Sequence, residues 1–236
     1  MGFLCNVCLN SSSVDLEEIH REVPSCAHCM STSRQREICW ALEKIASEFE
    51  YPYIVGISDH PVIENFLQLR HRCSYTNTFF HQTPKLDISN PKPFWENRAD
   101  ILINSDVIEH TLFPLKNSLD GCRDIVRDGG SLILTAPWSE KDESVEYYPW
   151  MVSYRTIINE GLVECFGLDI DGDEHLIDAP DFHGGPGNTL VTRKIELSQL
   201  LHELKQSGFT DIEVHQHDIP ELGIRRENGL GLIIAK

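Results

Sequence analysis

The chain has 236 residues, a formal net charge of -17 at pH 7 and 41% hydrophobic residues. This length suits one α/β domain with a small appendage, and the composition is ordinary for a soluble globular protein. The acidity disfavours nonspecific binding to nucleic acid and to anionic membranes. No apolar run approaches the roughly 20 residues of a membrane helix, and the first residues do not read as a secretion signal. We therefore expect a cytoplasmic protein without nucleic-acid or membrane partners.

Two Cys-x-x-Cys pairs lie within residues 1–33, and the other four of the eight cysteines are scattered. Without a secretion signal, such pairs favour a reducing compartment and a metal site over disulfides. Four thiolates suit a tetrahedral zinc ion in a closed, structural site. The alternatives are reduced, inert cysteines, or His28 in place of one thiolate. We predict a zinc-binding knuckle over residues 1–33 with the ligands Cys5, Cys8, Cys26 and Cys29.

The remaining residues, 34–236, alternate between strand and helix patterns. Apolar spacing predicts helices over 34–50, 59–70, 115–126 and 198–207. Short apolar or β-branched runs predict strands over 53–57, 73–80, 85–88, 99–104, 131–135, 209–217 and 231–235. Asp59 before Pro61 is typical of a helix start, and Gly208 is typical of a helix end. This alternation predicts an α/β fold with a mostly parallel sheet and helices on both faces.

Residues 138–190 break this alternation and form a predicted irregular insertion, rich in acids, glycines and aromatic residues. A connection this long usually carries function or its own small hairpins. Its glycine-dense loop from Phe182 to Gly187 contains His183, and we predict a flexible lid there because lids often hinge on glycine. The aromatic residues from Tyr147 to Tyr154 either line an acceptor pocket or form a minor core.

The stretch from Asp100 to Trp138 is the most informative part of the chain. It reads as a buried strand, a polar strand end, an amphipathic helix, a Gly-Gly turn and a second buried strand. Ligands of open α/β sheets bind at the carboxyl edge of the strands. The order of elements places a polar group of residues at that edge: Asn104, Ser105, Asp106, Glu109 and His110.

The same stretch resembles the fourth and fifth strands of class I S-adenosylmethionine-dependent methyltransferases. The motifs that carry the resemblance are Asp100-Ile-Leu, Val107-Ile-Glu-His110, Arg123 to Gly130, and Leu132 to Pro137. The chain also resembles a bacterial subgroup of this family with paired N-terminal cysteines. The residues that carry this second resemblance are Asn77-Thr78, His81, Pro84, Asp87-Ile88 and the loop from Phe182 to Gly187. The resemblance extends from about Tyr53 to the C-terminus. It implies a Rossmann-like sheet with an antiparallel end, S-adenosylmethionine as cofactor, and a small-molecule, sugar-linked or protein acceptor.

The chain departs from this family after the first strand, where Gly56-Ile-Ser58-Asp59 replaces a glycine-rich turn. In addition, no acid clearly ends the second strand, where the family holds the cofactor ribose. Ser58 and Asp59 can substitute, because a carboxylate accepts hydrogen bonds from an ammonium or hydroxyl group; alternatively, Asp59 only caps a helix. The resemblance places the adenine near Asp87, which is otherwise a turn acid. The predicted cofactor-binding residues are Gly56, Ser58, Asp59, Asp87, Ile88, Asn104, Ser105 and Asp106.

We predict Glu109, His110 and His183 as catalytic residues. His110 is a candidate general base near neutral pH, and Asp106 or Glu109 is a candidate for orienting the acceptor; packing at a helix entry is the alternative for His110. Methyl transfer depends on positioning and needs no nucleophilic side chain. Two other functions remain open. One is an inactive, methyltransferase-like, zinc-stabilised binding module. The other is a dehydrogenase-like nucleotide binder, which the missing glycine fingerprint disfavours.

Overall fold

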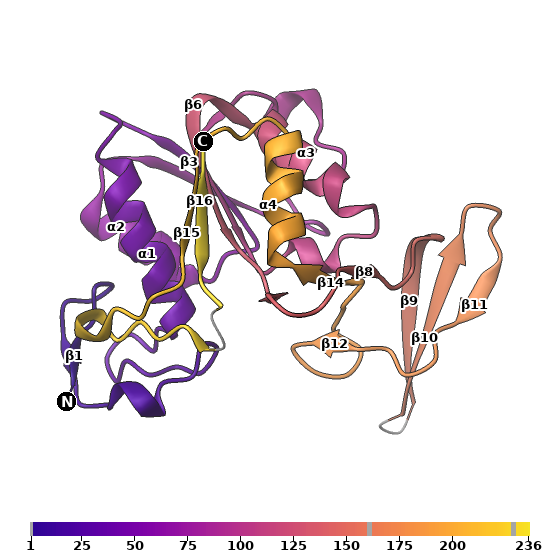
Figure 1. The fold of residues 1–236 in the computed structure, drawn as a ribbon, viewed down its shortest axis with the longest axis horizontal. Helices are drawn as coiled ribbons and strands as arrows, with labels where there is room; N and C mark the ends of the chain where they lie inside the picture. Colours follow the sequence, from indigo (N-terminus) through magenta and orange to yellow (C-terminus); the bar gives the residue numbers. More distant parts are fainter. Residues whose placement is uncertain (1, 160–161, 228–229) are drawn as a thin grey trace.

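The computed structural model describes residues 2–159, 162–227 and 230–236. Its centre is a sheet of six strands: β3 (Tyr53–Ile57), β4 (Ser74–Thr78), β5 (Ala99–Ser105), β6 (Val126–Thr135), β15 (Ile212–His215) and β16 (Leu232–Ala235). Their order is β15-β16-β6-β5-β3-β4 (Figure 1). Strands β4, β3, β5 and β6 are parallel, whereas β16 is antiparallel to both neighbours. The predicted, mostly parallel sheet with an antiparallel end is confirmed.

Four α-helices in the described part of the chain cover the two faces of this sheet. Figure 1 shows α1 (Ser33–Ala46) and α2 (Pro61–Arg70) on one side, and α3 (Leu115–Ile125) and α4 (Leu197–Gln206) on the other. Successive residues of β5 serve the two cores in turn: Ile101 and Ile103 pack in the α1–α2 core, and Leu102 packs in the α3–α4 core. This alternation follows from the two-residue period of a strand.

The helix ends follow from local sequence. The side chain of Thr32 accepts a hydrogen bond from the Gln35 N–H and forms a capping box with that residue at the start of α1. Pro61 occupies the first turn of α2, but His60 rather than Asp59 is the capping residue. Helix α4 ends before Gly208, whose φ of +97° favours glycine.

The prediction of a third strand over residues 85–88 is wrong, because an isolated bridge between Lys85 and Phe79 takes the place of a strand there. Pro84 has no N–H to donate to a ladder. Asp87 then accepts a hydrogen bond from the Ser89 N–H at 2.9 Å and closes a turn. Leu86 and Ile88 are nevertheless buried, so the apolar pattern reports burial rather than strand pairing.

The Gly-Gly segment lies inside β6, not in a turn before it, because β6 begins directly after α3. Gly129 has a φ of +74°. A Cβ at Gly130 would lie 2.9 Å from the carbonyl oxygens of Ala99 and Asp100. Gly130 therefore allows β6 to pass close to β5 where the register between the two strands shifts, whereas Gly129 is favoured by its positive φ alone.

The N-terminal knuckle packs into the same core as α1 and α2. It contains the two-stranded pair β1 (Phe3–Leu4) and β2 (Ser11–Ser12) and the 3₁₀ helix η1 (Leu16–Glu18). Buried Phe3, Val7 and Ile19 belong to the α1–α2 core. The described residues also form the 3₁₀ helices η2 (Pro93–Trp95), η3 (Ile108–His110) and η4 (Pro220–Leu222), of which η4 lies against β1.

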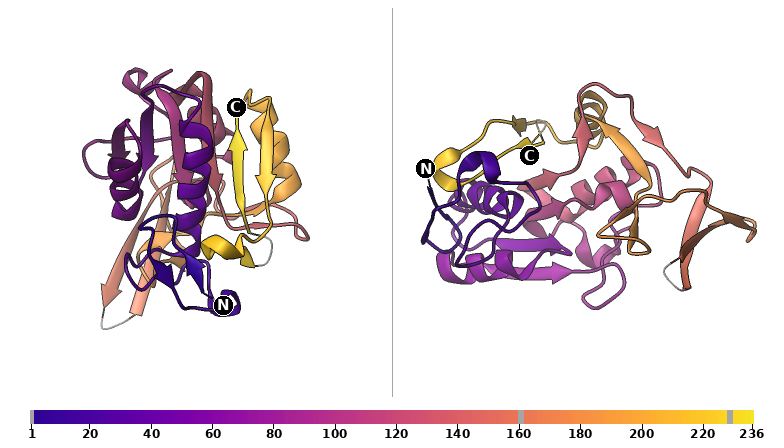
Figure 2. Two further views of the ribbon diagram at one scale, coloured as in Figure 1. Left: turned by 90° about the vertical axis from the view of Figure 1, so that its left-hand side faces the viewer. Right: turned by 90° about the horizontal axis from the view of Figure 1, so that it is seen from below.

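The segment between β6 and α4 forms small sheets whose strand pairs are antiparallel except for the parallel pair of β7 and β14. Strands β7 (Trp138–Ser139), β8 (Val145–Glu146) and β14 (Arg193–Glu196) form one sheet, and β12 (Phe182–His183) pairs with β13 (Thr189–Leu190). Strands β9 (Met151–Asn159), β10 (Leu162–Asp169) and β11 (Glu174–Leu176) form a third sheet, called the arm below, which projects from the main body (Figures 1 and 2). Residues 160 and 161 of the predicted insertion, and residues 1, 228 and 229 of the two predicted domains, lie outside the described residues.

No helix in the described part of the chain combines the length and the apolar character that crossing a membrane requires.

Candidate functional site

A cleft of about 910 Å³ opens at the carboxyl ends of β3, β4 and β5. Its other walls come from the segment 79–89, from residues after β5, from the arm and from the β12–β13 hairpin. Six of the predicted site residues line it: Ser58, Asp87, Ile88, Asp106, His110 and His183. The cleft therefore lies at the sheet edge where the sequence places a site.

Five predicted site residues do not line the cleft. Gly56 lies within β3, Asp59 in the loop after β3, and Asn104 within β5. Asn104 is fully buried, and its side-chain amide donates a hydrogen bond to Cys122 Sγ at 3.3 Å. The Ser105 hydroxyl lies 2.9 Å from that of Thr135. Glu109 is 1% exposed. The cofactor-binding role predicted for the first four of these residues and the catalytic role predicted for Glu109 stay predictions.

The loop after β3 is held by Asp59. Tyr75 donates a hydrogen bond from its hydroxyl to Asp59 Oδ2 at 3.0 Å, and a Cβ at Gly56 would lie 2.2 Å from that same oxygen. Burial raises the pKa of Asp59 to about 7, against the lowering effect of the Tyr75 hydrogen bond. Ser58, whose φ is +55°, is carried to the cleft by this loop. The buried Asp59 carboxylate therefore holds the loop after β3 in place through its contacts with Tyr75 and Gly56.

Asp106 joins the cleft wall to the N-terminal knuckle. Arg21 donates two hydrogen bonds to it, at 2.7 and 2.9 Å, and Arg34 Nε lies 3.3 Å from Asp106 Oδ2. The Thr135 hydroxyl donates a third hydrogen bond at 2.8 Å. Burial raises the pKa of Asp106, but the Arg21 hydrogen bonds and the two arginine charges outweigh it and hold that pKa well below its usual range. Sequence reasoning missed both arginines, since they follow no motif or periodic pattern.

The three predicted catalytic residues come together from η3 and β12. His110 Nε2 lies 3.2 Å from His183 Nδ1, and Glu109 Oε1 lies 3.6 and 3.9 Å from these two nitrogens. His110 Nδ1 lies 2.9 Å from the carbonyl oxygen of Leu190. Burial, with the charge of nearby Asp106, raises the pKa of Glu109 to about 8. The catalytic role of these residues stays a prediction.

The four knuckle cysteines also come together. Their sulfur atoms all lie within 4.8 Å of one another, with 3.6 Å between Cys5 and Cys29 and 3.7 Å between Cys8 and Cys26. Zinc–sulfur bonds of about 2.3 Å in a tetrahedron require sulfur atoms roughly 3.8 Å apart. The donor set therefore fits a zinc ion, whereas exposed His28 is outside the cluster.

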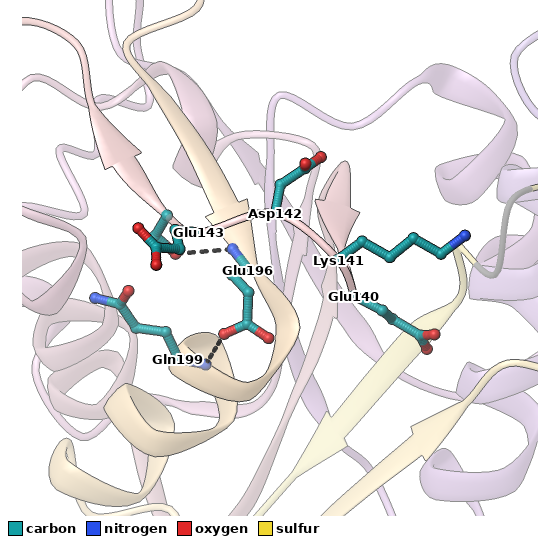
Figure 3. Close-up of a pocket in the computed structure, with 7 residues that line it drawn as sticks. Glu140, Lys141, Asp142, Glu143, Glu196 and Gln199 are labelled. Carbon is teal, nitrogen blue, oxygen red and sulfur yellow. Dashed lines mark hydrogen bonds between the residues drawn. The ribbon is translucent and has the colours of Figure 1, made fainter.

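A second hollow of about 460 Å³ lies at the start of α4, away from the predicted residues (Figure 3). Acidic side chains dominate its lining, which is Glu140, Lys141, Asp142, Glu143, Ser144, Glu196 and Gln199. The Glu196 carboxylate accepts hydrogen bonds from the backbone N–H groups of Ser198 and Gln199. Its position is explained by capping of the helix.

No family model matches the chain, and no curated protein matches it. Similar solved structures include the citrinin polyketide synthase CMeT domain, with 14% identity over 86% of this chain and 52% of that chain and a TM-score of 0.49. The sugar N-methyltransferase KedS8 from Streptoalloteichus sp ATCC 53650 has 10% identity over 84% of this chain and 85% of that one, with a TM-score of 0.48. An S-adenosylmethionine-dependent methyltransferase from Clostridium acetobutylicum ATCC 824 has 9% identity over 87% and 91%, with a TM-score of 0.46.

The chain spans about half the length of the polyketide synthase structure that it resembles. The assignment of the fold rests on the sheet itself. Four parallel strands, an antiparallel end, helices on both faces and a cleft at the carboxyl edge define a Rossmann-like α/β protein.

Proposed function

We propose that this chain is an S-adenosylmethionine-dependent methyltransferase. One observation carries the proposal: a single cleft joins Ser58, Asp87 and the segment after β5. At Asp87 and after β5 the sequence resembles the cofactor-binding and acceptor-binding segments of class I methyltransferases, whereas Ser58 occupies the loop in which the chain departs from the family's glycine-rich turn. The resemblance comes from the motifs, and the geometry supports it because three segments far apart in sequence line one space.

The cofactor is expected on the β3–β4 side of this cleft. Apolar Phe79, Leu86 and Ile88 line that side and suit an adenine ring, while Asp87 supplies a polar group beside them. A cleft of about 910 Å³ falls within the usual range for small-molecule sites and has room for more than one bound group. The acceptor would then occupy the side formed by η3, the arm and the β12–β13 hairpin.

The chemistry needs positioning more than reactive groups. A lone pair on the acceptor attacks the methyl carbon, the carbon–sulfur bond breaks with its electron pair moving to sulfur, and the acceptor loses its proton. The reaction converts a sulfonium into a neutral thioether, so holding donor and acceptor in line supplies much of the rate. Tyr154 and Arg155 of the arm line the acceptor side, and we expect a small-molecule, sugar-linked or protein acceptor there.

The proposed enzyme also contains a structural zinc ion in the Cys5, Cys8, Cys26 and Cys29 site, supported by the sulfur spacing. Thiolates held this way suit a reducing compartment, so we propose a cytoplasmic location.

Calorimetry with S-adenosylmethionine and S-adenosylhomocysteine tests the proposed activity. We expect both to bind, and Asp87→Ala to weaken binding by about tenfold, the usual effect of one lost hydrogen bond to a charged group. Asp142→Ala, in the second hollow, is the matched control and should leave the affinity unchanged. Absence of binding by either compound at millimolar concentration would exclude the enzyme and favour the inactive binding module.

A further inference from the structure

Three metal-ligand atoms converge at the acceptor side of the cleft. Glu109, His110 and His183 each offer one such atom, and the three atoms lie within 4.8 Å of one another. Bonds of about 2.1 Å to a metal ion place two imidazole nitrogens roughly 3.0–3.4 Å apart in octahedral or tetrahedral geometry. The separation between His110 Nε2 and His183 Nδ1 is 3.2 Å. The Glu109 oxygen, at 3.6 and 3.9 Å, needs to move by only a few tenths of an ångström.

The Glu109 carboxylate lacks the partners that its burial demands. It is 1% exposed, and neither of its oxygens has a hydrogen-bond partner among the described residues. Within that part of the chain no lysine or arginine lies in ion-pair distance of it, and its nearest cationic candidates are the two histidines. A buried carboxylate left in this state is costly unless it is paired or coordinates a metal ion.

The tautomer of His110 is fixed in the orientation that a metal ligand requires. A carbonyl oxygen can only accept, so the 2.9 Å contact with Leu190 places the ring proton on Nδ1. In the neutral ring, Nε2 then carries the lone pair and points toward the cluster. An imidazole N–H donated to a backbone carbonyl is the usual support of a metal-ligating histidine.

We propose that Glu109, His110 and His183 bind a divalent first-row transition-metal ion that holds an oxygen-containing acceptor in the cleft. Two imidazoles and one carboxylate suit zinc, iron(II), cobalt or manganese better than magnesium or calcium, which prefer oxygen ligands. Three protein ligands leave coordination positions open. Because His110 and His183 line the cleft, those positions face the acceptor side.

The role given to the ion rests on the proposed function, whereas the site itself does not. An oxygen ligand of the acceptor, such as a hydroxyl or two neighbouring hydroxyls, would fill the open positions. A metal-bound hydroxyl loses its proton more readily than a free one. The acceptor oxygen would therefore be held and made nucleophilic by the same contact, and its proton would pass to solvent.

Metal titration of the full-length protein tests this site without any cofactor. The cysteine site is first filled with about one equivalent of zinc, which four thiolates bind in preference to a site of nitrogen and oxygen ligands. Manganese(II) is then titrated while the free ion is followed by electron paramagnetic resonance. Manganese competes poorly for thiolates, so it reports on sites built from nitrogen and oxygen. We expect one further ion per chain, with affinity reduced at least tenfold in Glu109→Gln and in His183→Ala. His202→Ala, an exposed histidine on α4, is the matched control and should bind as the wild type does.

Cobalt(II) supplies a second readout that does not depend on variants. Ions in this site should add weak visible bands without the intense thiolate absorption of the cysteine site. A wild-type chain that binds only the ion held by cysteines overturns the proposal, as does equal affinity in the wild type, Glu109→Gln and His183→Ala. Calorimetry with S-adenosylmethionine separates the two hypotheses: metal without cofactor supports this site alone, and cofactor without metal supports the methyltransferase alone.

Discussion

Asp59 is the residue whose burial has the clearest consequence for pH dependence. Its pKa rises from 3.8 to about 7 in the folded chain because it is buried. The folded state therefore keeps a proton that the unfolded chain loses between pH 4 and 7. Since the unfolded state binds fewer protons in this range, the free energy of unfolding falls as the pH rises toward 7. Above pH 7 the folded carboxyl also loses its proton, and the free energy of unfolding falls no further through this group.

We expect Asp59→Asn to remove this loss, because the amide resembles the protonated acid. A rise in the Asp59 pKa from 3.8 to about 7 corresponds to roughly 4 kcal/mol at most. The gain in free energy of unfolding over the wild type should be about 2–3 kcal/mol larger at pH 8 than at pH 5, as measured by urea denaturation. Tyr75→Phe removes the hydrogen bond that lowers the pKa of Asp59, so the fall in the free energy of unfolding should extend to higher pH. Equal gains for Asp59→Asn at both pH values would contradict this account.

At the scale of elements, the Arg21–Asp106 pair joins the knuckle to the end of β5. The two side chains are 7% and 4% exposed, so removal of Arg21 leaves the Asp106 charge buried with Arg34, at 3.3 Å, as its remaining cationic partner. We expect Arg21→Ala to lower the free energy of unfolding by roughly 3–5 kcal/mol in urea denaturation. Glu22→Gln is the control: this acid also pairs with Arg21 but is 40% exposed, and its loss should cost less than about 1 kcal/mol.

A double variant tests whether the loss of the two Arg21 hydrogen bonds to the buried Asp106 charge is the cause. Asp106 has a φ of +53°, a conformation that asparagine tolerates. Arg21→Met with Asp106→Asn removes both charges, so its cost should be well below the sum of the single changes. If the costs simply add, lost packing rather than the poorly compensated Asp106 charge explains the effect of Arg21→Ala.

Local patterns predicted the elements that carry local signals. The strand expected at 53–57 coincides with β3, and the helix expected at 115–126 ends one residue earlier as α3. The prediction of a strand over residues 85–88 is wrong because Leu86 and Ile88 are buried without forming a ladder of backbone hydrogen bonds to a neighbouring strand. In the site, the sheet-edge argument predicted Asp106 and His110, the family resemblance predicted Asp87, and all three line one cleft. The Arg21–Asp106 pair joins residues 85 positions apart and depends on tertiary packing alone.

At the scale of the whole molecule, the knuckle is part of the main core rather than a separate unit. Phe3 and Ile19 pack with α1 and α2, and the buried Arg36 guanidinium of α1 donates hydrogen bonds to the backbone carbonyls of Ser31 and Gly223. Arg36 also lies near the knuckle cysteines: burial lowers the pKa of its guanidinium, and the negative charge of nearby cysteine thiolates opposes that lowering. Loss of the metal ion should consequently destabilise the α1–α2 side of the sheet as well as the first 33 residues.

Removal of the proposed zinc ion should therefore destabilise the entire chain in one step. We expect a strong chelator to lower the free energy of unfolding by several kcal/mol, because metal binding contributes directly to the folding of such sites. Trp40, beside the α1–α2 core, and Trp138, in the α3–α4 core, lie on different sides of the sheet. Fluorescence of single-tryptophan variants that keep one or the other should report the same midpoint.

Two cysteine variants distinguish the metal site from a general effect of thiol loss. Cys26→Ser should lose zinc, measured by elemental analysis, and should match the chelated wild type in stability. Cys73→Ser changes a half-buried cysteine outside the cluster and should keep about one zinc per chain at that site. A Cys26→Ser protein with full zinc content and wild-type stability would exclude the four-thiolate site. Separate midpoints for the two tryptophans would instead show that the knuckle unfolds independently of the sheet.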